Sequence, residues 1–216
     1  MDLKPTQKSL EEARVIASKI PTFHHHFHII YDIAETFGNK QINYVEIGAY
    51  AGASSCLMLG RKNTNVISID LGEPIPKGQV FENVLMYKNS PNIYKYIQGN
   101  SQTIEVKNQV IECLNTARAL SYSDTNKIDL LFIDGDHSFN GVISDFNMYS
   151  DMVSVGGYIV FDDYNDSVYS PEVKQAVDSL LPNLVDYEVL GTFENNLGAY
   201  PSELLEGNCF VIKKIK

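Results

Sequence analysis

The chain has 216 residues, of which 44% are hydrophobic and 20% charged, and its formal net charge is −10. These values are typical of one globular domain with a buried core, and no apolar run approaches the ~20 residues of a membrane helix. The negative charge leaves no basic surface for a polyanion, so we expect neither a nucleic-acid partner nor a membrane. The cysteines, Cys56, Cys113 and Cys209, are widely spaced, as expected of reduced thiols in a cytoplasmic protein.

The N-terminal part predicts two amphipathic helices, over residues 5–20 and 23–37, from apolar positions at helical spacing. The second would contain His24 and His28 on one face, at a spacing that metal sites use. No cysteine or carboxylate lies close by in sequence, so we expect the histidines to line a substrate cleft or face water.

The segment from Asn43 to Ser54 predicts a short apolar strand, a glycine turn and the start of a helix. Gly48 and Gly52 have no Cβ to obstruct a ligand, and the helix start offers free N–H groups aimed back over the turn. Such a corner, at the carboxyl end of a parallel strand, is where α/β folds hold nucleotides. A tight turn without a ligand is the alternative.

Two residues in this segment indicate which class of nucleotide the turn could bind. Tyr50 occupies the position of the middle glycine in a dinucleotide fingerprint, where a side chain would keep the backbone from a pyrophosphate. Glu46, directly before the turn, would repel phosphate. Both features favour a ligand with a cationic end and no phosphate, such as S-adenosylmethionine.

After the turn, the pattern alternates between apolar strands and amphipathic helices. The predicted strands cover 65–70, 94–98, 127–134, 158–163, 186–192 and 209–213, and the predicted helices cover 80–88, 104–120, 139–152 and 171–181. Gly156 and Gly157 are expected to form the turn that enters the strand at 158. The sequence between 194 and 207 is expected to be a loop. The prediction is one domain over 1–216, with helices in 1–40 and an α/β core in 42–216.

Several strands of this core end in acidic residues. Asp70 follows the glycine turn by about twenty residues, where an acid can accept both ribose hydroxyls, although an exposed strand-end carboxylate is the alternative. Asp134 and Asp136 follow one buried strand, and Asp162 and Asp163 follow the next. These carboxylates should meet at one edge of a parallel sheet and would repel one another unless a cation lay between them.

Oxygen ligands of this kind suit Mg²⁺ better than zinc, although an aspartate such as Asp136 could instead cap the next helix. His137 lies three residues past Asp134. A base with a near-neutral pKa is what removing a hydroxyl proton requires, and we expect His137 to be that base rather than a surface residue.

The residues from Glu46 to Ser54 resemble the S-adenosylmethionine-binding turn of the class I methyltransferases, and especially that of catechol O-methyltransferase, with its Gly-Ala-Tyr-x-Gly-x-Ser. The run from Gly99 to Gln102 resembles that family's Gly-Ala-Ser-Gln segment, whose serine contacts the adenine. Asp134 and the pair 162–163 fall where these enzymes hold Mg²⁺. The resemblance covers about residues 42–165.

Departures from the catechol enzymes shift the expected substrate. They have lysine at the position of His137 and asparagine at that of Asp163. This pattern looks more like the sugar O-methyltransferases of macrolide tailoring and their cephalosporin-biosynthesis relatives. It favours a hydroxyl of a small molecule, such as a sugar or natural-product intermediate. The absence of Asn-Pro-Pro-Tyr or Asp-Pro-Pro-Tyr after the fourth strand argues against DNA and amino-group methyltransferases.

The resemblance implies a Rossmann-like, doubly wound, seven-stranded α/β sheet with the last strand antiparallel. The cofactor site would be formed by Glu46, Gly48, Ala49, Tyr50, Gly52, Ser54, Asp70, Asn100, Ser101 and Asp134. Asp134, Asp162 and Asp163 would hold Mg²⁺ or another divalent cation, and His137 and Asp134 would be catalytic. The alternatives are a metal-independent methyltransferase, a nucleotide-binding oxidoreductase and a non-catalytic scaffold. The N-terminal helices could pair subunits in a homo-oligomer.

Overall fold

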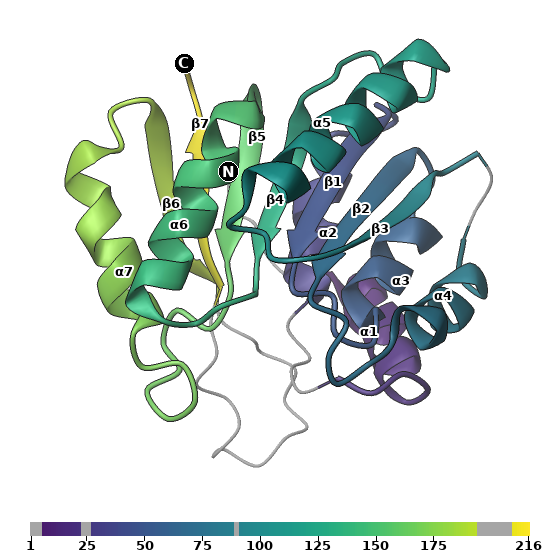
Figure 1. The fold of residues 1–216 in the computed structure, drawn as a ribbon, viewed down its shortest axis with the longest axis horizontal. Coiled ribbons are helices and arrows are strands. Elements are labelled where there is room, and N and C mark those ends of the chain that lie inside the picture. Colours follow the sequence, from purple (N-terminus) through teal and green to yellow (C-terminus); the bar gives the residue numbers. More distant parts are fainter. Residues whose placement is uncertain (1–5, 23–26, 89–90, 194–208) are drawn as a thin grey trace.

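The computed structural model describes residues 6–22, 27–88, 91–193 and 209–216. Their centre is a seven-stranded sheet in the order β3-β2-β1-β4-β5-β7-β6 (Figure 1). The strands are β1 (Ile42–Ile47), β2 (Thr64–Asp70), β3 (Tyr94–Gln98), β4 (Ile128–Ile133), β5 (Val153–Phe161), β6 (Tyr187–Phe193) and β7 (Cys209–Lys214). β1 to β5 pair in parallel, whereas β7 runs antiparallel to both β5 and β6. The predicted doubly wound sheet with an antiparallel last strand is confirmed.

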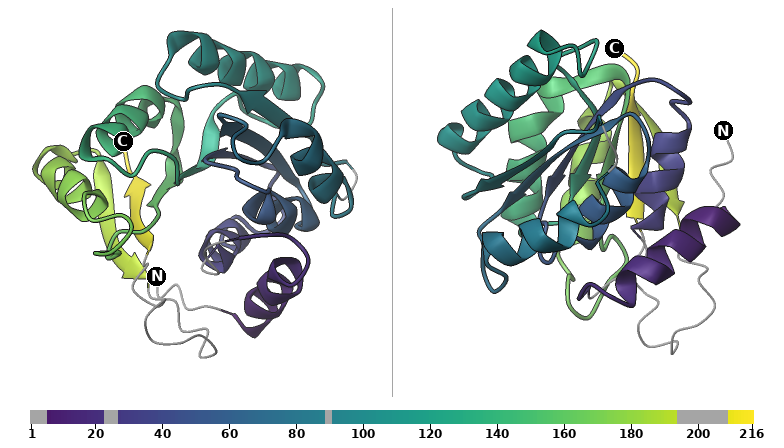
Figure 2. Two further views of the ribbon diagram at one scale, coloured as in Figure 1. Left: turned by 60° about the horizontal axis from the view of Figure 1, so that its bottom comes forward. Right: turned by 90° about the vertical axis from the view of Figure 1, so that its right-hand side faces the viewer.

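Helices cover both faces of this sheet (Figures 1 and 2). They are α1 (Gln7–Ala17), α2 (His28–Glu35), α3 (Ala53–Gly60), α4 (Lys77–Leu85), α5 (Ile104–Ala119), α6 (Phe139–Tyr149) and α7 (Val173–Leu180), with short 3₁₀ turns η1 (Ser150–Met152) and η2 (Leu181–Asn183). Residues of α1 to α4 pack in one apolar cluster with one face of the sheet, and residues of α5 to α7 pack in a second cluster with the other. The sheet therefore lies between two helical layers.

Side chains of the central strand β1 alternate between these two layers, as the period of a strand requires. Tyr44 belongs to the cluster of α1 to α4, and Val45 and Ile47 belong to the cluster of α5 to α7. Every residue of β1 is buried, so the strand shows no polar face. By this alternation, the side chain of Glu46 points to the same side of the sheet as Tyr44, toward the layer of α1 to α4.

Hydroxyl side chains begin several of the helices. Thr6 accepts a hydrogen bond from the N–H of Ser9 at the start of α1, and Ser138 accepts one from the N–H of Gly141 at the start of α6. A side-chain oxygen at this position satisfies an N–H that the helix leaves unpaired. Ser138 thus fixes the start of α6 directly after the acidic loop that follows β4.

The structure corrects two boundaries. Gly156 and Gly157 do not turn into β5 but lie inside it, where the pairing with β4 shifts register. Gly156 has a φ of +85°, and a Cβ on Gly157 would lie 2.9 Å from the carbonyl oxygen of Asp129. The glycines therefore form an irregularity within the strand. The second helix begins at His28, and residues 23–26 lie outside the described ones.

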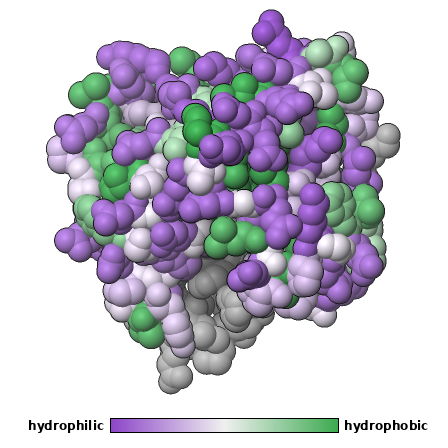
Figure 3. All heavy atoms as spheres, in the orientation of Figure 1, coloured by the Kyte–Doolittle hydropathy of each residue, from purple (hydrophilic) through white to green (hydrophobic). Residues whose placement is uncertain are grey.

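In the described part of the chain, no helix combines the length and the apolar character needed to cross a membrane. Figure 3 shows one face of the molecule, on which apolar side chains are scattered among polar ones.

Candidate functional site

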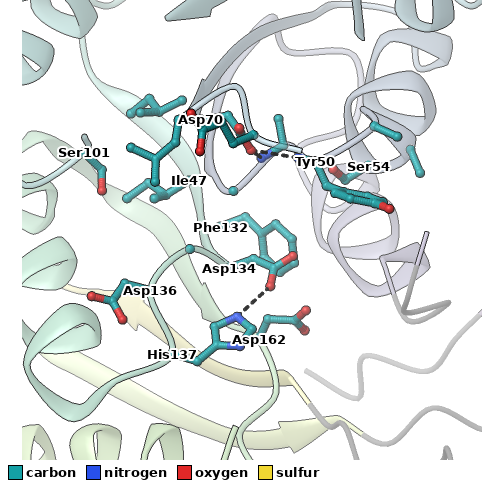
Figure 4. Close-up of a pocket in the computed structure, with 18 of the residues that line it drawn as sticks. Ile47, Tyr50, Ser54, Asp70, Ser101, Phe132, Asp134, Asp136, His137 and Asp162 are labelled. Carbon is teal, nitrogen blue, oxygen red and sulfur yellow. Dashed lines mark hydrogen bonds and ion pairs between the residues drawn. The ribbon is translucent and has the colours of Figure 1, made fainter. Parts of the chain in front are cut away.

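A cavity of about 450 Å³ opens at the edge of the sheet where the parallel strands end. Figure 4 shows it with Asp70, Tyr50 and Ser54 on the side of β1 and β2, and Asp134, His137 and Asp162 on the side of β4 and β5. Of the residues predicted for the cofactor and the reaction, the following line it: Gly48, Ala49, Tyr50, Ser54, Asp70, Asn100, Ser101, Asp134, His137 and Asp162. The structure thus brings together residues that are far apart in sequence.

The glycine turn after β1 forms one wall of this cavity. Gly48 has a φ of +89°, and a Cβ there would lie 1.8 Å from the carbonyl oxygen of Asp134. The backbone N–H of Asp134 donates to the carbonyl of Ile47 at 2.9 Å. The turn and the loop after β4 are therefore in backbone contact, which places the candidate cofactor turn beside the acidic loop.

Asp70 closes the turn from the end of β2. Its Oδ2 accepts the backbone N–H groups of Ala49 and Tyr50, each at 2.9 Å, and its Oδ1 accepts the N–H of Gly72 at 2.6 Å (Figure 4). The carboxylate lines the cavity beside the backbone of the turn. Asp70 therefore holds the turn by its backbone and presents its carboxylate at the cavity.

Glu46 lies outside the cavity lining. Because it shares a strand face with Tyr44, its fully buried carboxylate points toward α3. There it accepts hydrogen bonds from the hydroxyls of Tyr44 (2.8 Å), Ser54 (2.6 Å), Ser55 and Ser68 (2.7 Å). Burial raises the pKa of Glu46, and these hydroxyls oppose that rise. The carboxylate of Glu46 is therefore held by hydroxyl groups and does not face the cavity. Ser54, which donates to it, does line the cavity.

Three side chains form a compact cluster at the ends of β4 and β5. One ligand atom each from Asp134, His137 and Asp163 lies within 4.8 Å of the others. His137 Nε2 lies 3.3 Å from Asp134 Oδ1, and Nδ1 lies 3.5 Å from Asp163 Oδ2. Asp163 has a φ of +54°, an uncommon conformation for a residue with a side chain. Strained backbone of this kind gathers at functional sites.

The third predicted metal ligand, Asp162, lies beside this cluster rather than in it. Asp162 lines the cavity, whereas Asp163 does not. The buried thiol of Cys209 on β7 donates to Asp162 Oδ1 at 3.2 Å. Of the three predicted acids, the compact cluster therefore contains Asp134 and Asp163, with His137 in the third place.

Burial and mutual repulsion perturb the titration of this cluster. The pKa of Asp134 is raised well above its usual range, first by burial and then by the charge of Asp162. Burial alone would lower the pKa of His137, but the hydrogen bond to Asp134 and the surrounding carboxylates outweigh it and raise this pKa to about 9. These shifts favour the neutral form of Asp134 and the cationic form of His137.

Ser170, which no sequence pattern marks, contacts and orients His137. Its Oγ lies 2.7 Å from His137 Nδ1 and donates to Asp163 Oδ2 at 2.8 Å. Because the hydroxyl proton is directed at Asp163, the ring offers Nδ1–H to the hydroxyl oxygen. The other nitrogen, Nε2, is then the one that faces Asp134 and the cavity.

A second unexpected pair lies on the far side of the cavity, behind Ser101. The Ser101 hydroxyl donates to Oδ1 of Asp145 on α6 at 2.6 Å, and the Tyr149 hydroxyl donates to the Ser101 carbonyl at 2.8 Å. Asp145 is fully buried, and its Oδ2 has no hydrogen-bond partner among the described residues. Burial, and to a lesser degree the charge of Asp136, raises the pKa of Asp145 to about 6.

The raised pKa of Asp145 predicts a pH-dependent stability difference between the wild type and Asp145→Asn. An acid with a higher pKa in the folded state stabilises that state below its unfolded pKa of 3.8, and the contribution is lost as the pH rises through 6. Relative to Asp145→Asn, the wild type should lose about 2 kcal/mol of unfolding free energy between pH 4.5 and 7.5. Urea unfolding of both proteins measures this difference, and a pH-independent difference would contradict the raised pKa.

Some predicted residues are not in the cavity. Gly52 is not among the lining residues, and its φ of +86° serves the start of α3, where a Cβ would lie 2.9 Å from Val84. His28 is buried on α2 and is not part of the cavity lining either, so for this residue the expectation of a side chain that lines a cleft or faces water is wrong. His24 lies outside the described residues, as do the neighbouring histidines at 25 and 26.

Comparison with known proteins identifies the family. Residues 45–164 match the family described as "Methyltransferase domain". Uncharacterized protein R132 of Acanthamoeba polyphaga mimivirus is 37% identical over 191 residues, which cover 85% of this chain and 82% of that protein.

Solved structures share the fold at low sequence identity. An O-methyltransferase from Bacillus cereus in complex with SAH is 16% identical with a TM-score of 0.57, over 99% of this chain and 94% of that one. The MycE methyltransferase of the mycinamycin biosynthetic pathway, in complex with Mg and SAH, is 17% identical with a TM-score of 0.58, over 99% of this chain and 56% of that one. The resemblance seen in the sequence is thus confirmed, and the chain belongs to the methyltransferase domain family, with the fold of the class I S-adenosylmethionine-dependent enzymes.

Proposed function

We propose that this protein transfers a methyl group from S-adenosylmethionine to a hydroxyl oxygen of a small molecule, with the help of Mg²⁺ or another divalent cation. The observation that carries the proposal is the cluster of Asp134, His137 and Asp163, of which Asp134 and His137 line the same cavity as the glycine turn. A methyl donor held at the turn and an acceptor held at the cluster would meet within one cavity.

The cofactor half of the proposal is supported by the turn and the acids beside it. Gly48 brings the backbone of the turn close to the loop after β4, and Asp70 holds a carboxylate where ribose hydroxyls would reach it. Ser54 lines the cavity at the start of α3, and Ser101 lines it at the end of β3. S-Adenosylmethionine would lie between them, with its ribose at Asp70 and its adenine beside Asn100 and Ser101.

The residues present also fit a divalent cation. Asp134 and Asp163 offer hard carboxylate oxygens, and Asp162 adds another beside them. Burial, and after it the charge of Asp162, raises the pKa of Asp134, and a cation would offset both effects. When bound, the cation supplies positive charge that offsets these carboxylates and polarises a nearby substrate oxygen. If His137 is a ligand rather than a base, transition metals such as Mn²⁺ would suit the site better than Mg²⁺.

His137 is placed to take the proton of the acceptor. Ser170 holds its Nδ1–H, so Nε2 is the nitrogen that would receive the proton at the cavity. The carboxylates that raise the pKa of His137 to about 9 would have to be offset by the cation for Nε2 to be free of a proton near neutral pH. As the hydroxyl oxygen forms its bond to the methyl carbon, the carbon–sulfur bond breaks and its electron pair stays on sulfur, giving S-adenosylhomocysteine. The other contribution of the protein is to hold donor and acceptor in line.

For the acceptor we propose a sugar or a glycosylated metabolite. MycE, which shares the fold, was also solved with Mg, SAH and mycinamycin VI. The described lining contains the carboxylates of Asp70, Glu73, Asp134, Asp136 and Asp162, and neither lysine nor arginine. An acceptor without negative charge fits these walls better than a phosphorylated one.

Calorimetric titration with S-adenosylhomocysteine, with NAD as the control ligand, tests the cofactor class. We expect micromolar binding of S-adenosylhomocysteine and none of NAD. Binding of NAD instead would favour an oxidoreductase, and no binding of either would overturn the proposal. Titration of Mg²⁺ and Mn²⁺ into the wild type and Asp134→Asn then tests the metal, since the substitution should weaken cation binding.

A further inference from the structure

The hydrogen bond between Ser101 and Asp145 fixes the direction of a hydroxyl that borders the cavity. Ser101 Oγ lies 2.6 Å from Asp145 Oδ1, and an ionised carboxylate can only accept. The proton of the Ser101 hydroxyl therefore points at Asp145, away from the cavity. What remains for a ligand is the oxygen of Ser101 as an acceptor.

The surroundings hold this arrangement in place. Asp145 is fully buried, so water does not compete for its oxygens. The Tyr149 hydroxyl, from the next turn of α6, donates to the carbonyl of Ser101 at 2.8 Å and fixes the backbone that carries the hydroxyl. On the other side, Asp145 Oδ2 faces Gly135, where a Cβ would lie 3.5 Å away. The Ser101 hydroxyl thus has little freedom to turn.

We propose that Asp145 is a positioning residue that makes Ser101 a pure acceptor, and that this pair selects a 6-amino purine over a 6-oxo purine in the cofactor. The inference rests on the proposed function, in which the adenine lies beside Ser101. An exocyclic amine at position 6 donates to the Ser101 oxygen. A carbonyl at that position would set two acceptors against each other, because the only proton of the hydroxyl is held by Asp145.

The test compares two ligands, S-adenosylhomocysteine and its deaminated form, S-inosylhomocysteine, by calorimetry at pH 8, where Asp145 is ionised. The wild type should bind the adenosyl compound tighter by about tenfold or more, the cost of leaving a buried polar group unpaired. In Asp145→Asn, the amide can donate to Ser101 and free the hydroxyl proton for the ligand. Its ratio of the two dissociation constants should fall below about threefold.

Asp151→Asn is the matched control, because the same chemical change is made just beyond the end of α6, where the exposed side chain of Asp151 pairs with Lys107. Its ratio should equal that of the wild type. If Asp145→Asn does not fold, the single variant Ser101→Ala removes the acceptor oxygen while keeping Asp145, and it should bring the ratio near one.

Each outcome has a separate meaning. A ratio near one in the wild type, or an unchanged ratio in Asp145→Asn, would overturn the role of Asp145. Failure of the wild type to bind S-adenosylhomocysteine at all would instead overturn the proposed function. A ratio that falls in Asp145→Asn and not in Asp151→Asn would establish the positioning role.

Discussion

His137→Ala is expected to lower kcat by about 10²–10⁴-fold, the usual contribution of a general base, while the affinity for S-adenosylhomocysteine changes by less than about threefold. The reason is the position of the imidazole. Its Nε2 faces Asp134 across 3.3 Å where we propose that the acceptor binds, whereas Tyr50 and Asp70 of the proposed cofactor site lie on the other side of the cavity. Steady-state kinetics with the acceptor, together with calorimetry of cofactor binding, separates the two effects.

The same variant distinguishes a base from a metal ligand. His137 is close enough to Asp134 and Asp163 to share a cation with them. If His137 is the base, the cation concentration for half-maximal activity should stay the same in His137→Ala while kcat falls. If it is a ligand, that concentration should rise. Activity equal to that of the wild type would remove His137 from the mechanism altogether.

Ser170 provides a graded comparison for this experiment. Ser170→Ala removes the hydroxyl that holds Nδ1–H and leaves the imidazole in place, so its loss of kcat should be smaller than that of His137→Ala. Ser170→Thr keeps the hydroxyl and should recover most of the activity. A Ser170→Ala variant with the kcat of the wild type would show that the hydrogen bond does not position His137.

The convergence of the acids could be predicted from the sequence because it depends only on topology. Parallel strands end at one edge of a sheet, so the last residue of β2 and the residues directly after β4 and β5 must meet there. Asp70, Asp134 and Asp162 do so, and the cavity forms between them. Alternating strands and helices were enough to derive this without any long-range contact.

The face of β1 to which the Glu46 side chain points could not be predicted in this way. Strand β1 is buried on both faces, so its apolar pattern does not reveal which residues face which layer of helices. In the sequence, Ser54 indicates only the start of a helix. The structure shows that Ser54 and Ser55 share the carboxylate of Glu46 with Ser68 from β2.

Ser170 and Asp145 could not have been selected from the sequence for a different reason. Ser170 contacts His137 from 33 residues away, and Asp145 contacts Ser101 from 44 residues away. Each sits in a segment whose local pattern is ordinary, a polar loop in one case and an amphipathic helix in the other. Only the packing of α6 and of the loop after β5 against the strand ends gives these side chains their partners.

Gly48→Ala is expected to have the largest effect on the fold, because the added Cβ would lie 1.8 Å from the carbonyl oxygen of Asp134. The obstacle is backbone, so no rotation of a side chain relieves the overlap. In addition, the φ of +89° is unfavourable for any residue with a Cβ. Overpacking and backbone strain together should lower the free energy of unfolding by roughly 3 kcal/mol or more. Urea unfolding of the variant measures this.

Gly78→Ala is the matched control, since Gly78 lies in the first turn of α4 and a Cβ there meets no atom within 4 Å. It should be neutral or stabilising by up to about 1 kcal/mol. Any Gly48→Ala protein that folds must have separated the turn from the loop after β4, which moves Asp134 away from the cofactor wall. Such a protein should have lost binding of S-adenosylhomocysteine, whereas a stable variant with the affinity of the wild type would show that this backbone contact does not build the site.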